Sequence, residues 1–293
     1  MPELPEVETI ARGLASLVQG DVIESVWLSS KPEPLKSPAF EIAATLENKR
    51  ISGVRRMGKH IVFDLESFVP KRAPGRGRSM KSAARGASLP RPAPSGRNQW
   101  IVHLGMTGRL LVCPPDAELV KHTHAVLRLA SNRELRFIDP RRFGRLSVAH
   151  GFRAAGVEPL EVERERFIGL FRGRKTPIKS ALLNQKLLGG VGNIYADESL
   201  FRAAIRPRRR ASSLSRQNLQ RLRRAVQEVL QEAIALGGSS VSDYVDADGE
   251  KGFFQLRHRV YGREGEPCLN CRTPIKRIVI AGRSSHYCPQ CQK

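Results

Sequence analysis

The sequence lacks any run of about 18 consecutive apolar residues, the length that a membrane-spanning helix requires. It also lacks a basic N-terminal segment followed by an apolar stretch, so no secretory signal peptide is expected. Acidic side chains are scarce, with 28 Asp and Glu against 50 Lys and Arg. These absences argue against membrane and secreted proteins, and we expect a cytoplasmic or nucleoid-associated protein without a membrane partner.

The excess of basic residues gives the 293-residue chain a formal net charge of +22. Such a charge favours a polyanionic partner, and nucleic acid is the first candidate. Binding of this kind should weaken steeply as salt is raised, because phosphate contacts release condensed counterions. Charge alone leaves a ribosome-associated or unspecific basic protein open as an alternative.

Cysteine is nearly absent before the last 26 residues, where four of the five cysteines lie. Cys113, in an apolar run, is typical of a small buried apolar residue. Cys268-x2-Cys271 and Cys288-x2-Cys291 are separated by 16 residues that suit a β-hairpin, a spacing typical of a tetrahedral zinc ribbon. The alternative is two redox or disulfide pairs. No further ligand is suggested, so a zinc ion here would be structural.

The first half of the chain predicts a β-rich domain. Helical periodicity covers 4–19 and 38–49, and short apolar or alternating runs between 51 and 148 indicate strands. Residues 70–98 interrupt this pattern with five prolines, four glycines, eight basic residues and no acidic residue. We predict a disordered loop there. It is either a loose electrostatic arm on DNA or an insertion without a role.

The second half predicts helices, which we expect over 165–173, 177–188, 193–204 and 215–236. Asn193 is the expected N-cap of the third. The turn GGVG (189–192) precedes this helix. Either the free N–H groups at the helix start bind a phosphate, or the turn is only a corner between two helices.

The N-terminus begins Met-Pro-Glu. Removal of Met1 would leave Pro2 with a free secondary amine, and amines form Schiff bases with carbonyl carbons. An α-amino group titrates near neutrality, at a pKa of about 7.7–8.0. Glu3 would be able to donate or relay a proton, above all if burial raises its pKa. The alternative is that Pro2-Glu3 simply leads into a helix.

Six motifs follow one another along the chain: MPELPEVE, RRMGKH (55–60), HLGMTG (103–108), DPRRFG (139–144), LLNQKLLGGVGNIYADESLF (182–201) and the cysteine quartet. Together they resemble the motifs of bacterial formamidopyrimidine-DNA glycosylases. The resemblance spans nearly the whole chain outside 70–98. His60 stands where Tyr or Phe is more usual in that family.

The resemblance implies an α+β fold with DNA in the cleft between two main domains. An N-terminal β-sandwich with flanking helices would cover 1–155 and contain the insert. A helix–two-turn–helix domain would cover 156–256, with a lesion-capping loop at 237–256. A four-cysteine zinc ribbon would cover 257–293.

The resemblance also assigns roles to residues. Pro2 would be the nucleophile, Glu3 would handle the proton at the sugar, Lys59 would serve β-elimination and Arg283 δ-elimination. Residues expected to bind DNA, as backbone contacts or by filling the gap left by the everted base, are His122, Arg141, Arg174, Asn193, Met106 and Phe143. Residues expected around the lesion are Glu6, Ser239 and Tyr244. The zinc ligands would be Cys268, Cys271, Cys288 and Cys291.

The activity implied is excision of oxidised purines, chiefly 8-oxoguanine and formamidopyrimidines, from double-stranded DNA in base excision repair. Strand cleavage by β,δ-elimination would follow through a Schiff base on Pro2, in a monomer with one structural Zn²⁺. Two alternatives stay open from the residues. One is an endonuclease VIII-like glycosylase for pyrimidine lesions, and the other is a zinc-ribbon nucleic-acid binder without activity.

Overall fold

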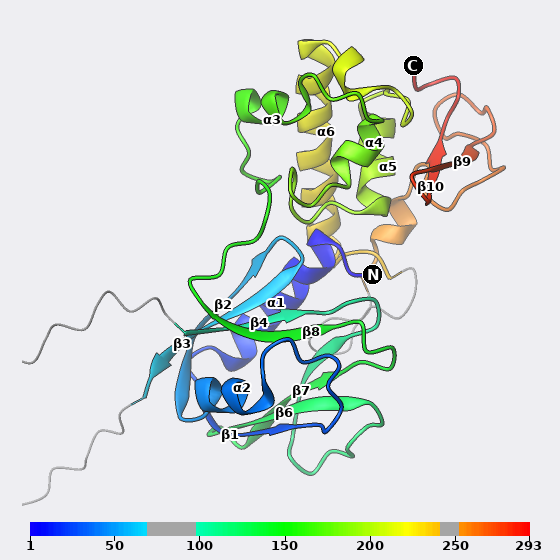
Figure 1. The fold of residues 1–293 in the computed structure, drawn as a ribbon. Coiled ribbons are helices and arrows are strands. Elements are labelled where there is room, and N and C mark those ends of the chain that lie inside the picture. The colour runs from blue at the N-terminus through cyan, green and yellow to red at the C-terminus, as the bar shows by residue number, and fades with distance from the viewer. Residues whose placement is uncertain (69–97, 241–251) are drawn as a thin grey trace, which may run out of the picture.

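The computed structural model describes residues 1–68, 98–240 and 252–293 (Figure 1). The insert predicted at 70–98 lies outside the described residues, apart from Asn98, which begins a strand. Most of the predicted lesion-capping loop, including Tyr244, also lies outside them. Within the described part of the chain, none of the helices is long and apolar enough to cross a membrane.

The first domain is a β-structure with two helices, as the sequence predicts. Its eight strands form one antiparallel sheet in the order β5-β7-β6-β1-β2-β3-β4-β8. The elements are α1 (Leu4–Val18), β1 (Val22–Leu28), α2 (Ala39–Leu46), β2 (Lys49–Met57), β3 (His60–Ser67), β4 (Asn98–His103), β5 (Arg109–Cys113), β6 (Thr123–Leu129), β7 (Arg133–Ile138) and β8 (Arg145–His150).

The sheet folds over on itself into a β-sandwich, whose two layers lie one above the other in Figure 1. The register shifts inside β1, β2 and β6, and such bulges bend and twist strands. Apolar side chains from both layers meet in one core, centred on Phe63, Trp100 and Phe137. The apolar face of α1 completes that core with Val7, Ile10, Ala11, Leu14 and Val18.

The second domain is helical and lies above the first in Figure 1. Its elements are α3 (Arg164–Phe171), α4 (Ile178–Leu182), α5 (Asn193–Arg202), the 3-10 turn Ala211–Ser213, α6 (Arg216–Ala235) and the 3-10 turn Phe254–Arg257. Ser215 is the N-cap of α6, and its hydroxyl accepts the N–H of Asn218 at 3.2 Å. Leu4 of α1 belongs to this domain's core, so the start of the chain joins the two domains.

Two predictions about this domain were wrong. The helix expected over 177–188 ends at Leu182, because the side chains of Asn184 and Gln185 bond nearby main-chain groups and stabilise turns instead. Asn193 is not an N-cap but the first residue of α5, and Gly192 holds the cap position.

The chain ends in a small zinc-finger unit built on the predicted hairpin. Strands β9 (Lys276–Ile280) and β10 (Arg283–Tyr287) pair antiparallel. The unit is anchored to α5 by two buried acids. Glu198 accepts the main-chain N–H groups of residues 259–261 at 2.8–3.0 Å, and Asp197 accepts the N–H of His286 at 2.8 Å.

Candidate active site at the domain junction

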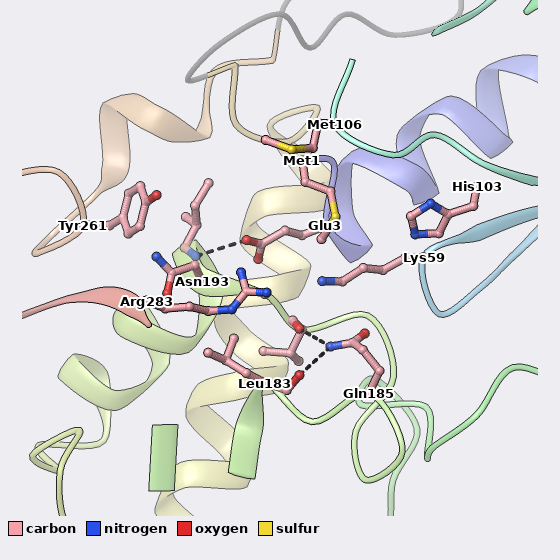
Figure 2. A pocket seen from close by; sticks show the side chains of 13 residues that line it. Met1, Glu3, Lys59, His103, Met106, Leu183, Gln185, Asn193, Tyr261 and Arg283 are labelled. Atoms are coloured by element: carbon pink, nitrogen blue, oxygen red, sulfur yellow. Dashed lines mark hydrogen bonds between the residues drawn. The ribbon is translucent and has the colours of Figure 1, made fainter. Parts of the chain in front are cut away.

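A cavity of about 390 Å³ lies where the β-sandwich, the helical domain and the finger meet. Figure 2 shows Glu3, Lys59 and Arg283 pointing toward one another inside it, although they come from the N-cap of α1, the β2–β3 turn and the finger. The cavity also contains Met106 and Asn193. Five of the residues singled out from the sequence therefore share one site. The full lining is Met1, Glu3, Lys59, His103, Met106, Leu183, Gln185, Val191, Gly192, Asn193, Ile194, Tyr261 and Arg283.

The GGVG turn holds the start of the chain in this cavity. The N–H of Leu4 donates to the carbonyl of Gly190 at 3.0 Å. Gly190 has a φ of +92°, and a Cβ there would stand 2.8 Å from the Leu4 Cβ. Only glycine fits both demands. Pro2 is half-buried beside these residues and is thereby held at the edge of the cavity. Its nitrogen forms the peptide bond to Met1, which lines the cavity.

Glu3 is a buried carboxyl group at the N-terminus of α5. Its Oε1 accepts the N–H of Ile194 at 3.2 Å. Burial raises the pKa of Glu3 from 4.5 to about 7, with a further rise from Glu6 and an opposing effect from Lys59. Near neutral pH this group can therefore both donate and accept a proton.

The N–H of Ile194, in the first turn of α5, donates to the Glu3 carboxylate of the same chain. The GGVG turn and the start of α5 therefore hold the N-terminal residues in place. The phosphate-site interpretation of this turn stays a prediction.

Glu6 lies behind Glu3 and joins three segments. Its Oε2 accepts the N–H of Glu3 at 2.7 Å, and its Oε1 accepts the N–H of Ser239 at 2.8 Å and the hydroxyl of Tyr195. Burial raises the pKa of Glu6, although these hydrogen bonds oppose the rise. Ser239 and Phe253 form a β-bridge at the base of the predicted lesion-capping loop, so Glu6 connects this base to Glu3.

Lys59 is a buried amine that faces the carboxyl group of Glu3 across the cavity (Figure 2). Burial lowers the pKa of Lys59, and the nearby Arg283 lowers it further, while Glu3 and Glu6 oppose the shift. A larger fraction of this amine is therefore unprotonated near neutral pH than for an exposed lysine.

His103 also lines the cavity, and the sequence analysis missed it. Its Nδ1 accepts the N–H of Gly105 at 3.1 Å, so Nε2 carries the proton of the neutral ring. Burial lowers the pKa of His103 to about 4, helped by His60, Arg145 and Lys59. The ring is thus a neutral N–H donor. Its place in the quoted HLGMTG motif, three residues before Met106, was the available signal.

Arg283 and Asn193 are positioned by the contact between α5 and the finger. The amide of Asn193 donates to the hydroxyl of Ser284 at 3.3 Å. The carbonyl of Ser284 accepts from Lys179 Nζ at 2.6 Å, and Lys179 forms a fully buried ion pair with Asp197 at 2.7 Å. No sequence pattern predicts this buried pair, since Lys and Asp in a helix are usually exposed.

Met106, Arg141 and Phe143, the residues predicted to fill the gap left by the everted base, lie on two turns that pack together. Buried Asp139 joins the turns by accepting the Thr107 hydroxyl at 2.6 Å and the Gly144 N–H at 2.7 Å. Met106 and Phe143 remain exposed, and the Arg141 guanidinium lies 4.9 Å from the centre of the Phe143 ring. Exposed apolar side chains backed by a rigid support are what insertion between bases requires.

The structure does not bring every predicted residue into the cavity. His122, with a φ of +69°, lines a separate hollow together with Arg142, behind the DPRRFG turn. Arg174 lies exposed on the helical domain, where its Nε donates to the carbonyl of Leu170 at 2.6 Å. Both lie outside this cavity, as expected of backbone contacts along a duplex.

The four cysteines of the finger form a zinc-binding site. Their sulfur atoms all lie within 4.8 Å of one another. The Cys268–Cys291 and Cys271–Cys288 separations of 3.9 and 3.4 Å are near the edge of about 3.8 Å that a tetrahedron with Zn–S bonds of about 2.3 Å requires. All four thiols are free, which argues against two disulfides. With four protein ligands, the ion would be structural.

Three family models match successive parts of the chain. The formamidopyrimidine-DNA glycosylase N-terminal domain matches residues 1–146, and the H2TH domain of the same enzymes matches 156–245. The zinc finger found in FPG and IleRS matches 265–293.

Full-length relatives carry the same description. The chain is 44% identical over 297 residues to formamidopyrimidine-DNA glycosylase of Solibacter usitatus, with 100% of both chains covered. It is 43% identical over 306 residues to that of Thermus thermophilus, covering 100% of this chain and 98% of the relative.

Solved structures agree with these matches. MutM (Fpg) of Thermus thermophilus superposes with a TM-score of 0.80 at 40% identity, covering 99% of this chain and 98% of that one. A Lactococcus lactis Fpg variant bound to DNA containing Fapy-dG superposes with a TM-score of 0.83 at 31% identity over 100% of both chains. MutM bound to DNA containing carbocyclic 8-oxo-G gives 0.83 at 30% identity, again over both whole chains.

Proposed function

The chain belongs to the formamidopyrimidine-DNA glycosylase family, and from this premise we propose that Pro2 is its nucleophile and that Glu3, Lys59 and Arg283 act around it. The protein is a bifunctional glycosylase and AP lyase for oxidised purines in base excision repair. Family membership decides against a zinc-ribbon binder without activity, and the relatives with oxidised-purine ligands favour the purine branch over the endonuclease VIII-like alternative.

The position of the N-terminus is the observation that carries this proposal. Glu3 and Leu4 are clamped by the GGVG turn and Glu6, so Pro2 has little freedom at the edge of the cavity. A chain end would ordinarily fray. Fixing an amine beside buried acid and base groups is useful only if the amine reacts, since orientation lowers the entropic part of the barrier.

In the first step, the freed nitrogen of Pro2 attacks C1′ of the damaged nucleotide and the base departs. The sugar ring opens to an iminium ion on Pro2, and Glu3 manages the proton at the sugar. Its pKa of about 7 suits that exchange near neutral pH.

The iminium ion then acidifies the C2′ proton. Loss of this proton expels the 3′ phosphate, which is β-elimination. Lys59 acts as the proton donor in this step. A second elimination, with Arg283 beside the phosphate, expels the 5′ phosphate. Hydrolysis of the iminium finally restores the Pro2 amine.

The remaining site residues would hold the DNA in this geometry. The target base must leave the stack before C1′ can be reached. Met106, Arg141 and Phe143 would fill the gap, and His122, Arg174 and Asn193 would hold phosphates on either side. Glu6 and Ser239 would set the floor beneath the everted base, with Tyr244 in the loop above.

We further propose domain boundaries at 1–155, 156–256 and 257–293, and action in the bacterial cytoplasm on the nucleoid. The family matches, which break between 146 and 156 and between 245 and 265, support these boundaries. The +22 charge supports nucleoid association.

The nucleophile can be tested with two forms of one sequence, the protein with Met1 removed and the protein that retains it. Borohydride is added during reaction with an 8-oxoguanine duplex, and covalent complex and strand cleavage are measured. We expect both only with the processed form, because Met1 converts the Pro2 amine into an amide. Equal trapping by the two forms would show that Pro2 is not the nucleophile.

A further inference from the structure

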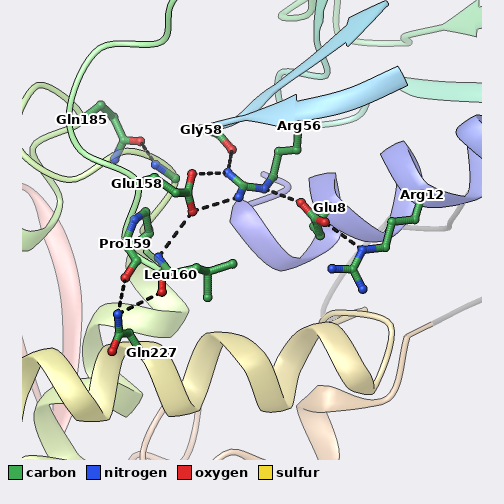
Figure 3. Close-up of polar contacts among 10 residues, drawn as sticks. Glu8, Arg12, Arg56, Gly58, Glu158, Pro159, Leu160, Gln185 and Gln227 are labelled. Carbon is green, nitrogen blue, oxygen red and sulfur yellow. Dashed lines mark hydrogen bonds and ion pairs between the residues drawn. The ribbon is translucent and has the colours of Figure 1, made fainter. Parts of the chain in front are cut away.

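Arg56 is a buried arginine that three separate segments of the chain surround (Figure 3). Its side chain is 5% exposed. Nε donates to Glu8 of α1 at 2.7 Å, and the two terminal nitrogens bind both oxygens of Glu158 at 2.9 Å each. Nη1 also donates to the carbonyl of Gly58 at 3.3 Å. The planar guanidinium is suited to such a multiple role, because its donors form a rigid fork.

Burial of this cation needs compensation. A guanidinium removed from water is stabilised only where carboxylates and carbonyls satisfy its donors. Two carboxylates do so here, which together outweigh the opposing effect of burial and raise the pKa of Arg56. The arginine therefore stays charged and holds all three segments at once.

The first segment is the turn that carries Lys59. The carbonyl of Gly58 belongs to the peptide bond that joins Gly58 to Lys59. Gly58 has a φ of +60° and connects β2 to β3 in a tight turn. Holding this carbonyl sets the direction of the main chain at Lys59, whose side chain enters the cavity.

The second segment is α1, which Arg56 holds through Glu8. The same helix starts at Leu4, directly after Glu3. Arg56 thus has one contact on each of the two elements that bring Lys59 and Glu3 face to face.

The third segment is the connector between the two main domains, which contains Glu158. The amide of Gln227 in α6 donates to the carbonyls of Pro159 and Leu160 at 3.2 and 3.0 Å, just beyond Glu158. On its other side, the N–H of Gly189 in the GGVG turn donates to the carbonyl of Val157 at 2.9 Å. The connector thereby follows the helical domain.

We propose that Arg56 is a positioning residue that sets Lys59 opposite Glu3 and makes that placement depend on the orientation of the two domains. Because Glu158 follows the helical domain, a change in the orientation of that domain moves Arg56. Arg56 in turn moves the turn that carries Lys59 and the start of α1. The inference rests on the proposed function, in which Lys59 and Glu3 act on the sugar.

The test compares Arg56→Met with Arg55→Met. Arg55 is a matched control, because it is the neighbouring arginine on β2, is 43% exposed and pairs with Asp64. Side chains alternate along a strand, so it faces away from Arg56. Single-turnover cleavage and borohydride trapping are measured on an abasic-site duplex at saturating DNA, and Kd is measured separately by titration.

We expect Arg56→Met to lower the single-turnover rate about 10- to 100-fold with Kd close to that of the wild type, because a small misplacement of reacting groups has effects of this order. Arg55→Met should cleave like the wild type. Arg56→Lys should recover only part of the rate, since an ammonium group cannot hold both carboxylates and the carbonyl.

Glu158→Gln keeps Arg56 and the contacts to Glu8 and Gly58, so it reports on the connector even if Arg56→Met folds poorly. It should lower the rate by less than Arg56→Met does. The inference is overturned if Glu158→Gln and Arg56→Lys both cleave at the wild-type rate, or if their rates fall only as far as their DNA affinity falls. Absence of trapping in the wild type and in Arg55→Met would instead overturn the proposed function.

Discussion

The carboxyl group of Glu3 lies so close to the main chain of Gly192 that a Cβ at position 192 would stand 2.2 Å from the Glu3 Cδ. Gly192 has a φ of −129°, which other residues adopt, so its lack of a side chain is what matters. We expect Gly192→Ala to push Glu3 out of place and lower the single-turnover cleavage rate by about 100-fold. The accompanying loss of stability, measured by urea unfolding, should be about 1–3 kcal/mol.

Gly169→Ala is the control for this variant. Gly169 lies inside α3, and an added Cβ there would meet no atom within 4 Å. It should leave cleavage unchanged and stabilise the protein by about 0.5–1 kcal/mol. Full activity of Gly192→Ala would contradict the placement of Glu3.

The raised pKa of Glu3 makes stability depend on pH. The folded state holds this proton up to about pH 7, whereas the unfolded chain loses it near 4.5. The contribution of this proton to the free energy of unfolding is therefore fully present below pH 4.5 and is lost as pH rises through 7. Glu3→Gln removes it, so the variant should gain about 3 kcal/mol relative to the wild type between pH 4.5 and 8. A difference in unfolding free energy that stays constant across this range would show that Glu3 titrates normally.

The ion pair between Lys179 and Asp197 should be sensitive to removal of one partner. Both side chains are fully buried, so Lys179→Met leaves the buried Asp197 carboxylate without its lysine and should destabilise the protein by about 3–5 kcal/mol in urea unfolding. Adding Asp197→Asn should recover much of this loss, because the charge disappears while an acceptor for the His286 N–H remains. No recovery in the double variant would mean that packing, and not charge, dominates.

Zinc removal should affect the finger and leave the β-sandwich intact. The finger has its own small apolar cluster, separate from the core of the sandwich. Chelation should release one zinc ion per chain and lower DNA affinity, because Arg283 lies on the hairpin that the ion holds. Calorimetry should show the melting transition of the sandwich at the same temperature with and without zinc. A common shift of all transitions would contradict this independence.

Local patterns predicted much of this structure. The spacing of the four cysteines and the hairpin between them are properties of a short segment, and both are confirmed. The helix that starts at Leu4 and the strands of the sandwich follow from apolar periodicity. The helix after Pro177 was predicted too long, because the bonds from Gln185 to Gly190 and Val191 that replace its last turns are invisible to periodicity.

The parts that escaped prediction depend on contacts between distant segments. Acidic side chains on a helix are usually exposed, yet Asp197 and Glu198 are both buried where the finger docks. His103 becomes a cavity residue only when β4 ends beside Lys59. The occupation of the α5 N-terminus by Glu3 joins residues 191 positions apart. A sequence pattern cannot show such pairings without the fold.

The residue that carries the borohydride-trapped DNA decides whether Pro2 is the nucleophile. The processed protein is trapped on an 8-oxoguanine duplex, digested with nuclease and trypsin, and its peptides are analysed by mass spectrometry. We expect the reduced sugar remnant on the N-terminal nitrogen of the peptide covering 2–12, which begins at Pro2. A remnant on Lys59 or another lysine, with an unmodified Pro2 peptide, would contradict this role of Pro2.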